Sequence, residues 1–183
     1  MTTFIPSLTL PAAIFANQAT SIFFPVLVGA GIGYSLRPKE TQKTYMKLKQ
    51  PPYRPPPSIF GPTWTILYGL MGYAAHRAYR TGMSPLASTN QYHLTKQGAT
   101  LYTIQLGLNF LWMPLFFGLR RPIESAIDII ALSGTVGYLS YVWSRVDPVA
   151  SLLLTPYCAW LAFASYLTVG VGYLNGWSIT GRE

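Results

Sequence analysis

Long runs of apolar residues alternate with short polar connections along the chain. Five of these runs are each roughly 20 residues long, about the length that an α-helix needs to cross the hydrocarbon core of a bilayer. They are approximately Thr20 to Leu36, Phe60 to Tyr79, Leu101 to Leu119, Ile123 to Trp143, and Val149 to Leu174. Backbone groups in lipid must satisfy their own hydrogen bonds, so the runs are predicted to be helices. The pattern therefore predicts an all-α membrane protein, a bundle of five transmembrane helices.

The polar connections divide the chain into three parts. Residues 1–19 carry no charge and are predicted to be an N-terminal tail or a lead-in on the membrane surface. Residues 20–177 hold the five runs, and residues 178–183 form a C-terminal tail. The first run lacks a charged segment before it and is followed by a basic loop, so it is interpreted as a span and not as a cleaved signal.

Two connections are long. Residues 37–59 hold the proline-rich stretch "PPYRPPP". Residues 80–100 are polar and rich in turn-forming residues, and they are predicted to be an exposed loop. The other two connections, "RRP" and "RVDP", are short and indicate antiparallel neighbours. Prolines at positions 25, 114 and 156 lie inside predicted spans, where each removes a backbone hydrogen bond and is expected to kink its helix.

Composition supports the membrane interpretation, and the placement of charge predicts the orientation of the protein in the membrane. Half of the residues are hydrophobic and only 10% are charged, against about 25% in a typical soluble domain. The net charge of +8 lies between the runs and forms no nucleic-acid reading surface. One side collects Arg37, Lys39, Lys43, Lys47, Lys49, Arg54, Arg120, Arg121 and Arg182, and the other only Arg77, Arg80, Lys96 and Arg145. This bias predicts a C-terminus in the cytosol and an N-terminus outside.

Three predicted helices each carry aromatic or polar residues at helical spacing. Trp64 and Tyr68 are four apart, Asn109 and Trp112 are three apart, and Tyr157, Trp160 and Ala164 follow the same spacing. If these faces converge, they form a flat-walled apolar pocket with few polar anchors, which suits planar ligands. The alternative is that the Asn109 amide, which is unfavourable in lipid, only ties two helices together.

Other polar residues favour structural roles. Glu124 and Asp128 are one turn apart, as an acid-base pair would be, but acids in the first turn of a helix are also stabilised by its dipole and by the flanking Arg121. His76 and His93 have no second ligand one turn away, which argues against a metal site and leaves a lone haem-ligating histidine open. The single cysteine excludes an internal disulfide.

Two pairs of small residues permit close helix contact. Gly29 and Gly33 lie four apart in the first run, and Ser133 and Gly137 lie four apart in the fourth. Such pairs bring helices together within one bundle or between protomers. A homodimer is therefore left open beside the monomer.

Three segments carry a resemblance to a known family. "QPPYRPPPSIFGPTWTILYGLMGYA", "LGLNFLWMPLFFG" and "TPYCAWLAFA" resemble the TspO/MBR family, which includes the tryptophan-rich sensory proteins and the translocator proteins once called peripheral-type benzodiazepine receptors. The resemblance extends from Tyr45 to about Trp177. It implies five transmembrane helices and a ligand pocket open toward the cytosol, with residues 37–59 folded over it as a lid. Because proline restricts φ and lowers the entropy lost on ordering, "PPYRPPP" would act as a stiff strap across the mouth.

The resemblance also implies ligands and residues that bind them. Family members bind porphyrins such as protoporphyrin IX and haem, synthetic isoquinoline carboxamides and, in animals, sterols. The matching pocket residues are Tyr45, Pro51, Phe60, Trp64, Tyr68, Asn109, Trp112, Trp160 and Ala164. The expected function is a receptor or transporter for porphyrin or haem, with no cofactor of its own and no nucleic-acid partner. The family also implies the mitochondrial outer membrane in a eukaryote.

Two other functions remain beside porphyrin transport. Some bacterial relatives promote light-dependent porphyrin breakdown through the tryptophans that match Trp64 and Trp160, so an enzyme-like role stays open, as does a scaffold in a membrane complex. Tyr53 and Ser58 stand where many relatives have tryptophan, which puts ligand preference in doubt. The sterol-recognition pattern of the last helix is missing here, and its loose match at Leu70, Tyr73 and Arg77 is weak evidence.

Overall fold

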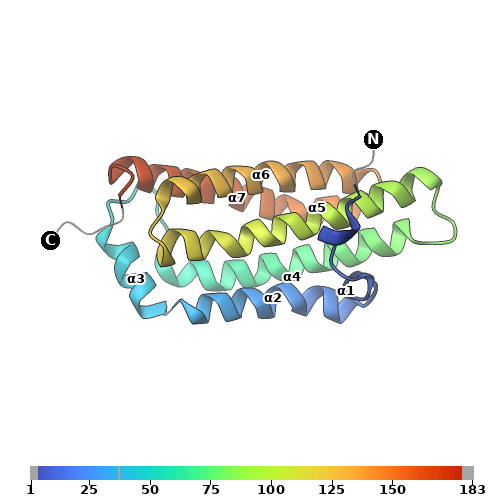
Figure 1. Ribbon diagram of the computed structural model, residues 1–183, viewed down its shortest axis with the longest axis horizontal. Coiled ribbons are helices and arrows are strands. Elements are labelled where there is room, and N and C mark those ends of the chain that lie inside the picture. Colours follow the sequence, from blue (N-terminus) through green and yellow to red (C-terminus); the bar gives the residue numbers. More distant parts are fainter. Residues whose placement is uncertain (1–3, 37, 179–183) are drawn as a thin grey trace.

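The computed structural model describes residues 4–36 and 38–178. Within them, five long helices run side by side (Figure 1). These are α2 (Gln18–Ser35), α4 (Pro57–Gly82), α5 (Thr89–Met113), α6 (Pro122–Ser144) and α7 (Pro148–Leu174). Shorter elements lie at the ends: η1 (Pro6–Leu8), α1 (Ala12–Ala16) and α3 (Pro38–Lys47), together with the π-helical turn η2 (Pro114–Gly118) that continues α5. The predicted all-α class is confirmed, and each predicted run corresponds to one long helix, except that the third run extends from α5 through η2.

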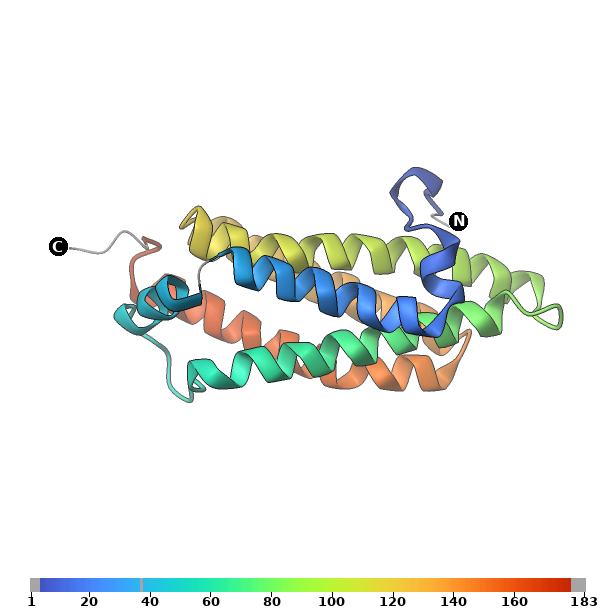
Figure 2. The same cartoon turned by 90° about the horizontal axis from the view of Figure 1, so that it is seen from below.

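The five long helices close a ring. α2 packs against α4, α4 against α7, α7 against α6, and α6 against α5, which returns to contact α2. The connections after α2 and after α5, and the end of α7, lie at one end of the bundle, where α3 crosses (Figure 2). α1 lies at the opposite end (Figure 1). We call these the α3 end and the α1 end. The connections that carry most of the basic residues therefore share the α3 end.

Local sequence signals set the helix ends. The Asn17 side chain accepts a hydrogen bond from the Thr20 N–H and caps α2, and Asp147 caps α7 by accepting from two N–H groups of its first turn. Ser88 and Gln91 form a reciprocal capping box at the start of α5. α4, α6 and α7 begin with proline. At the first position of a helix the backbone N–H would have no acceptor within the helix, so its absence in proline costs no hydrogen bond.

The prediction of a long exposed loop over residues 80–100 is wrong. α4 continues to Gly82 and α5 begins at Thr89, so the connection is only residues 83–88. Three of the polar residues that suggested a loop, Thr95, Gln97 and Thr100, are buried in the bundle, where Gln97 donates to the Tyr138 hydroxyl at 2.9 Å. Thr100 is buried and holds the N-terminal segment through a hydrogen bond from the Ile5 N–H. These residues are polar because they form hydrogen bonds inside the bundle, and not because they face water.

The α1 end is closely packed. Ser21 donates to the Gly72 carbonyl at 2.7 Å, and a Cβ at Gly72 would meet the backbone of α2, so only glycine lets α2 and α4 approach this closely. The Phe15 ring, which the sequence placed in a tail, is buried and stacks on Tyr79 at 5.6 Å between ring centres. Of the predicted C-terminal tail, residues 179–183 lie outside the described residues.

Two helices in the described part of the chain, α6 and α7, are long and apolar enough by length and composition to cross a membrane. Polar groups such as Arg77 and Gln105 lower the hydropathy of α4 and α5 below that of α6 and α7. Large apolar side chains nevertheless cover the outside of several helices, as Leu27, Ile66 and Leu152 are each more than 60% exposed. Apolar surface of this extent is typical of a protein in lipid. Five membrane crossings stay a prediction.

Candidate functional site

A cavity of about 620 Å³ opens inside the ring at the α3 end. All five long helices contribute to its lining, and α3 adds Thr41, Gln42 and Tyr45. Its size falls in the range of about 300–1,000 Å³ that is usual for small-molecule sites. Most of the lining is aromatic or aliphatic, so the cavity suits a ligand that is largely apolar.

The aromatic wall of the cavity is built from rings on α4 and α7. The Trp64 ring meets the Trp160 ring edge to face, with centres 6.4 Å apart and planes at 89°. Phe60 packs against Trp160 with ring centres 5.9 Å apart, and Tyr157 packs against Trp64 with ring centres 6.1 Å apart. Edge-to-face pairs place the partly positive edge of one ring on the negative face of the next, which stabilises this arrangement. The wall therefore presents fixed ring faces to a ligand.

A chain of hydrogen bonds crosses the bundle beside the cavity. Tyr68 donates to Asn109 Oδ1 at 2.6 Å, Asn109 Nδ2 donates to the Tyr157 hydroxyl at 2.8 Å, and Tyr157 donates to Gln105 Oε1 at 3.0 Å. Gln105 Nε2 ends the chain on Met71 Sδ at 3.6 Å. Both interpretations of Asn109 hold, because it ties α5 to α4 and α7 and also lines the cavity.

The donor-to-acceptor direction of these hydrogen bonds determines which donors and acceptors stay unused and could bind a ligand. The Tyr68 proton is engaged by Asn109, so the Tyr68 oxygen is available as an acceptor. The Asn109 amide has a second N–H that none of the hydrogen bonds among the described residues uses. The cavity therefore presents one acceptor and one donor side by side.

Two indole N–H groups in the wall have no hydrogen-bond acceptor among the described residues. They belong to Trp112 and Trp160, and both nitrogen atoms are covered by neighbouring protein atoms. A buried donor without a partner is unfavourable, by about 1–3 kcal/mol in typical cases. A ligand oxygen brought within reach by a small rotation of either ring would remove that cost.

The segment after α2 contributes Thr41, Gln42 and Tyr45 to the cavity lining, and the predicted loop contains the helix α3. Its role as a lid stays a prediction. The Tyr45 ring on α3 packs edge to face on Phe60, with centres 5.7 Å apart. Its hydroxyl lies 3.5 Å from the Pro55 carbonyl, and burial raises the pKa of the phenol above its ordinary value of 10.0. Tyr45 therefore stays neutral and links α3 to the strap.

The proline-rich strap is fastened to α7. Asn175, just after α7, accepts from the Lys49 N–H at 3.0 Å and donates to the Lys49 carbonyl at 2.8 Å. Tyr166 donates to the Pro52 carbonyl at 3.2 Å. Pro51 is buried against Gly170, where a Cβ would lie 3.0 Å from the proline ring. The strap runs from α3 across the end of α7 before it enters α4.

Eight of the nine predicted pocket residues line the cavity. These are Tyr45, Phe60, Trp64, Tyr68, Asn109, Trp112, Trp160 and Ala164. The ninth, Pro51, is not part of the lining and packs against Gly170 on α7.

Sequence reasoning missed part of the lining. Leu132 on α6 lines the cavity, and so does Thr168, which stands one turn beyond Ala164. The helical spacing from Trp160 could have extended to Thr168, whereas nothing in the sequence marked the α6 face.

The remaining candidates lie elsewhere. Glu124 pairs with Arg121 at 3.3 Å, in agreement with its structural interpretation, and Asp128 is buried without a hydrogen-bond partner among the described residues. His76 is buried at the α1 end and lies on α4 with its Nδ1 2.8 Å from the Phe15 carbonyl, so it is remote from the cavity. His93 is exposed on α5. In the described part of the chain no three His, Cys, Asp or Glu residues form a group that could hold a metal.

Only part of the small-residue pattern is explained by packing within the bundle, and a homodimer stays a prediction. At Gly29 a Cβ would meet the Tyr68 ring, so this glycine serves packing within the bundle. Around Gly33 and Gly137 a Cβ would meet nothing within 4 Å. Ser133 lies 3.2 Å from Ser165 on α7, so its contact is also internal.

Comparison with known sequences decides the family. The profile of the TspO/MBR family matches residues 21–174, which cover all five long helices of the ring except the first turn of α2. The chain belongs to the TspO/MBR family. This is a family of membrane proteins, and its translocator and tryptophan-rich members support a membrane receptor or translocator role for this TspO/MBR chain.

Relatives come from several kingdoms. The chain is 44% identical over 163 residues to a translocator protein homolog of Schizosaccharomyces pombe, an alignment covering 89% of this chain and 94% of that one. It is 40% identical to the tryptophan-rich protein TspO of Archaeoglobus fulgidus, over 75% of this chain and 83% of the relative. It is 34% identical to the human translocator protein, over 82% and 86% of the two chains.

Proposed function

We propose that the cavity binds a tetrapyrrole such as protoporphyrin IX or haem, and that this TspO/MBR protein acts as a membrane receptor or transporter for it. The observation that carries the proposal is the wall of Phe60, Trp64 and Trp160 around a cavity of about 620 Å³. Edge-to-face contacts hold these ring faces in place, and a planar aromatic ligand can stack on them.

The surroundings of the cavity favour a ligand that carries acids. Lys39, Lys43 and Lys47 on α3 are exposed at the cavity mouth. The carboxylates of a porphyrin placed near this mouth would lie beside these ammonium groups, while its ring system enters the apolar interior. A sterol or another uncharged ligand would use the apolar walls alone, and it is the competing ligand class in the test.

Titration of the purified protein with protoporphyrin IX tests the assignment. Binding is followed by quenching of tryptophan fluorescence in detergent or nanodiscs, with haem and cholesterol in parallel. Trp160→Ala is expected to weaken protoporphyrin binding roughly tenfold, because about 1.5 kcal/mol of stacking is lost. Trp177→Phe, which removes a tryptophan outside the cavity, is the matched control and should leave the affinity unchanged. Equal affinities for the wild type and Trp160→Ala would exclude this cavity as the binding site.

We infer that all five long helices cross the bilayer, with the α3 end in the cytosol. The basic residues gathered at the α3 end support this orientation. In a Cys158→Ala background, a cysteine introduced at Lys47 should react with a membrane-impermeant maleimide from the cytosolic side. A cysteine at Leu86, which is 95% exposed at the α1 end, should be protected from that side. The reverse labelling would invert the orientation. In a eukaryotic cell the mitochondrial outer membrane is the proposed location, and fractionation tests it.

Light-dependent porphyrin breakdown is a second candidate function. It is favoured by the direct contact of the Trp64 and Trp160 rings in the cavity wall, since adjacent indoles lie where they could exchange an electron with an excited ligand. Illuminated and dark incubations with protoporphyrin IX, analysed for products, separate the two functions. A product that forms only in light, and not with Trp64→Phe, would establish the reaction. Absence of any product leaves a binding protein.

A further inference from the structure

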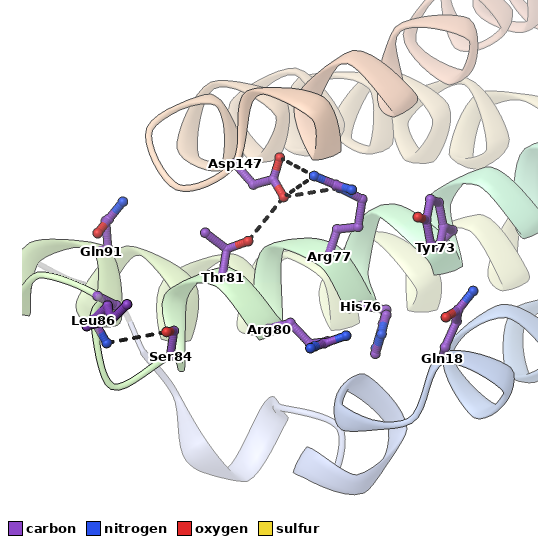
Figure 3. Close-up of a pocket in the computed structure, with 11 residues that line it drawn as sticks. Gln18, Tyr73, His76, Arg77, Arg80, Thr81, Ser84, Leu86, Gln91 and Asp147 are labelled. Atoms are coloured by element: carbon purple, nitrogen blue, oxygen red, sulfur yellow. Dashed lines mark hydrogen bonds and ion pairs between the residues drawn. The ribbon is translucent and has the colours of Figure 1, made fainter.

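A second pocket, of about 460 Å³, lies at the α1 end, opposite the cavity. It lies over the last turns of α4, between the start of α2 and the turn that joins α6 to α7 (Figure 3). Its lining is mostly polar and includes Gln18, His76, Arg77, Arg80, Thr81 and Gln91. We call it the arginine pocket. We propose that it binds the phosphate group of an anionic phospholipid from the leaflet at the α1 end.

The acid in this pocket is already neutralised. Asp147 is 5% exposed and accepts hydrogen bonds from the Val149 and Ala150 N–H groups at 2.9 and 3.2 Å. Thr81 donates to it at 3.1 Å, and Arg77 pairs with it at 3.1 Å. Figure 3 shows Arg77 and Thr81 turned toward this carboxylate. With its oxygens engaged, Asp147 holds the helices together and presents little negative charge to a ligand.

The pocket retains one positive charge without a counterion. Arg80 is exposed and has no hydrogen-bond or ion-pair partner in residues 4–36 and 38–178, whereas Arg77 is paired. Arg77 uses Nε and Nη2 toward Asp147 and also interacts with the Tyr73 hydroxyl, so it adds positive charge to the pocket while Arg80 is the guanidinium that is free to bind. Two guanidinium groups that line one pocket, one of them unpaired, favour a phosphate, which accepts hydrogen bonds on several oxygens.

The surface of α4 below the pocket is apolar. Pro62, Ile66, Gly69 and Tyr73 follow helical spacing along one partly exposed face, and nothing lies within 4 Å of where a Gly69 Cβ would stand. From Pro62 to Tyr73 this stripe is about 16 Å long at 1.5 Å per residue. Half of a hydrocarbon core of about 30 Å is close to that length. The stripe therefore matches one acyl chain in one leaflet, and it leads directly to the arginine pocket.

Charge and apolar contact together distinguish an anionic phospholipid from two other possible ligands, a sterol and a free phosphate ion. The spacing of Leu70, Tyr73 and Arg77 also fits the loose sterol pattern, but a sterol hydroxyl is uncharged and gains little from two guanidinium groups. A free phosphate ion would use the arginines and not the apolar stripe. A phospholipid with a net negative charge uses both.

The test compares three probes on the detergent-solubilised full chain, with binding followed by native mass spectrometry and thermal shift. The probes are dioctanoyl phosphatidylglycerol, dioctanoyl phosphatidylcholine and inorganic phosphate. Arg80→Gln is expected to weaken phosphatidylglycerol binding roughly five- to tenfold, because one charge-assisted contact is lost. Arg145→Gln removes an exposed arginine at the same end but outside the pocket, and its effect should stay below about twofold. Phosphatidylcholine should bind more weakly and respond less to Arg80→Gln.

Three results would overturn the proposal. Equal losses in Arg80→Gln and Arg145→Gln would show that only net charge matters. Inorganic phosphate that displaces phosphatidylglycerol as effectively as the lipid itself would assign the pocket to a soluble anion. A loss of lipid binding in Trp160→Ala would place the lipid in the aromatic cavity. Because Arg80 has no partner among the described residues, Arg80→Gln should unfold at the wild-type temperature, and lipid binding is tested independently of the porphyrin proposal.

Discussion

At the α1 end small residues let helix backbones touch, whereas at the α3 end large rings hold the helices apart. Gly72 brings α4 onto the backbone of α2, and Gly98 brings α5 onto the Trp143 ring of α6. At the α3 end, Trp64 on α4 and Trp160 on the neighbouring helix α7 meet each other and leave about 620 Å³ beside them. The interior of the bundle is therefore solid at the α1 end, where the arginine pocket lies at the surface, and hollow at the α3 end, because of residue size and not of helix number.

Replacing Gly72 on α4 is expected to have the largest effect, because it would disrupt the close packing of the α1 end. Gly72→Leu is expected to destabilise the protein by about 4 kcal/mol or more, or to prevent folding, because the side chain would overlap the α2 backbone. Gly69→Ala on the same helix meets nothing within 4 Å and should be neutral or stabilising by up to about 1 kcal/mol. Thermal unfolding in detergent measures both. Similar melting temperatures for the two variants would show that α2 and α4 do not touch at Gly72.

Replacing the central amide would have the next largest effect. Asn109→Leu removes the hydrogen bonds with Tyr68 and Tyr157, and the buried Tyr157 hydroxyl loses its donor, so the expected cost is about 2–3 kcal/mol. Gln97→Leu, at the solid end, loses one bond to Tyr138, whose hydroxyl is on a 48% exposed residue and has other partners within reach. Its expected cost is about 1 kcal/mol. If Gln97→Leu were the more damaging variant, the network beside the cavity would not hold the hollow end together.

Loosening the strap would have the smallest effect on stability and would act on the hollow end alone. Asn175→Ala removes two hydrogen bonds to the Lys49 backbone, at an exposed position where the expected cost is about 1 kcal/mol. The strap would leave the cavity mouth more often, so bound protoporphyrin IX should dissociate several times faster in stopped-flow measurements. Asn175→Asp keeps the acceptor for the Lys49 N–H, so its dissociation rate should lie between those of the wild type and Asn175→Ala. An unchanged dissociation rate in Asn175→Ala would mean that the ligand leaves by another route.

Much of the fold could be predicted from apolar runs, because a lipid-exposed helix has to be apolar over its whole length. The same rule failed between α4 and α5, where Thr95, Gln97 and Thr100 are polar but buried. Gln97 and Thr100 are hydrogen-bonded to residues distant in sequence, Tyr138 and Ile5, while Thr95 donates to the Gln91 carbonyl one turn earlier. Hydropathy registers neither kind of partner. The core position of Phe15 was missed for a similar reason, since its neighbours Tyr79 and Tyr102 come from other helices.

The candidate site was predictable where one helix face carries it. Trp64, Asn109 and Trp160 were found by spacing, since residues three or four apart share a face. Pro51 was misplaced because a strap has no periodicity, and its contact with Gly170 depends on where the chain crosses α7. Leu132 was missed because an ordinary leucine gives no sign of whether it faces lipid or a cavity.

The clamp between Asn175 and Lys49 couples the strap to the last turn of α7. Asn175 directly follows that helix, and its side chain holds the Lys49 backbone through both of its polar atoms. A substitution that frays the end of α7 would therefore also release the strap, even though the substituted residue lines no part of the cavity. Slow exchange of the Lys49 amide hydrogen would report directly that the two segments are joined.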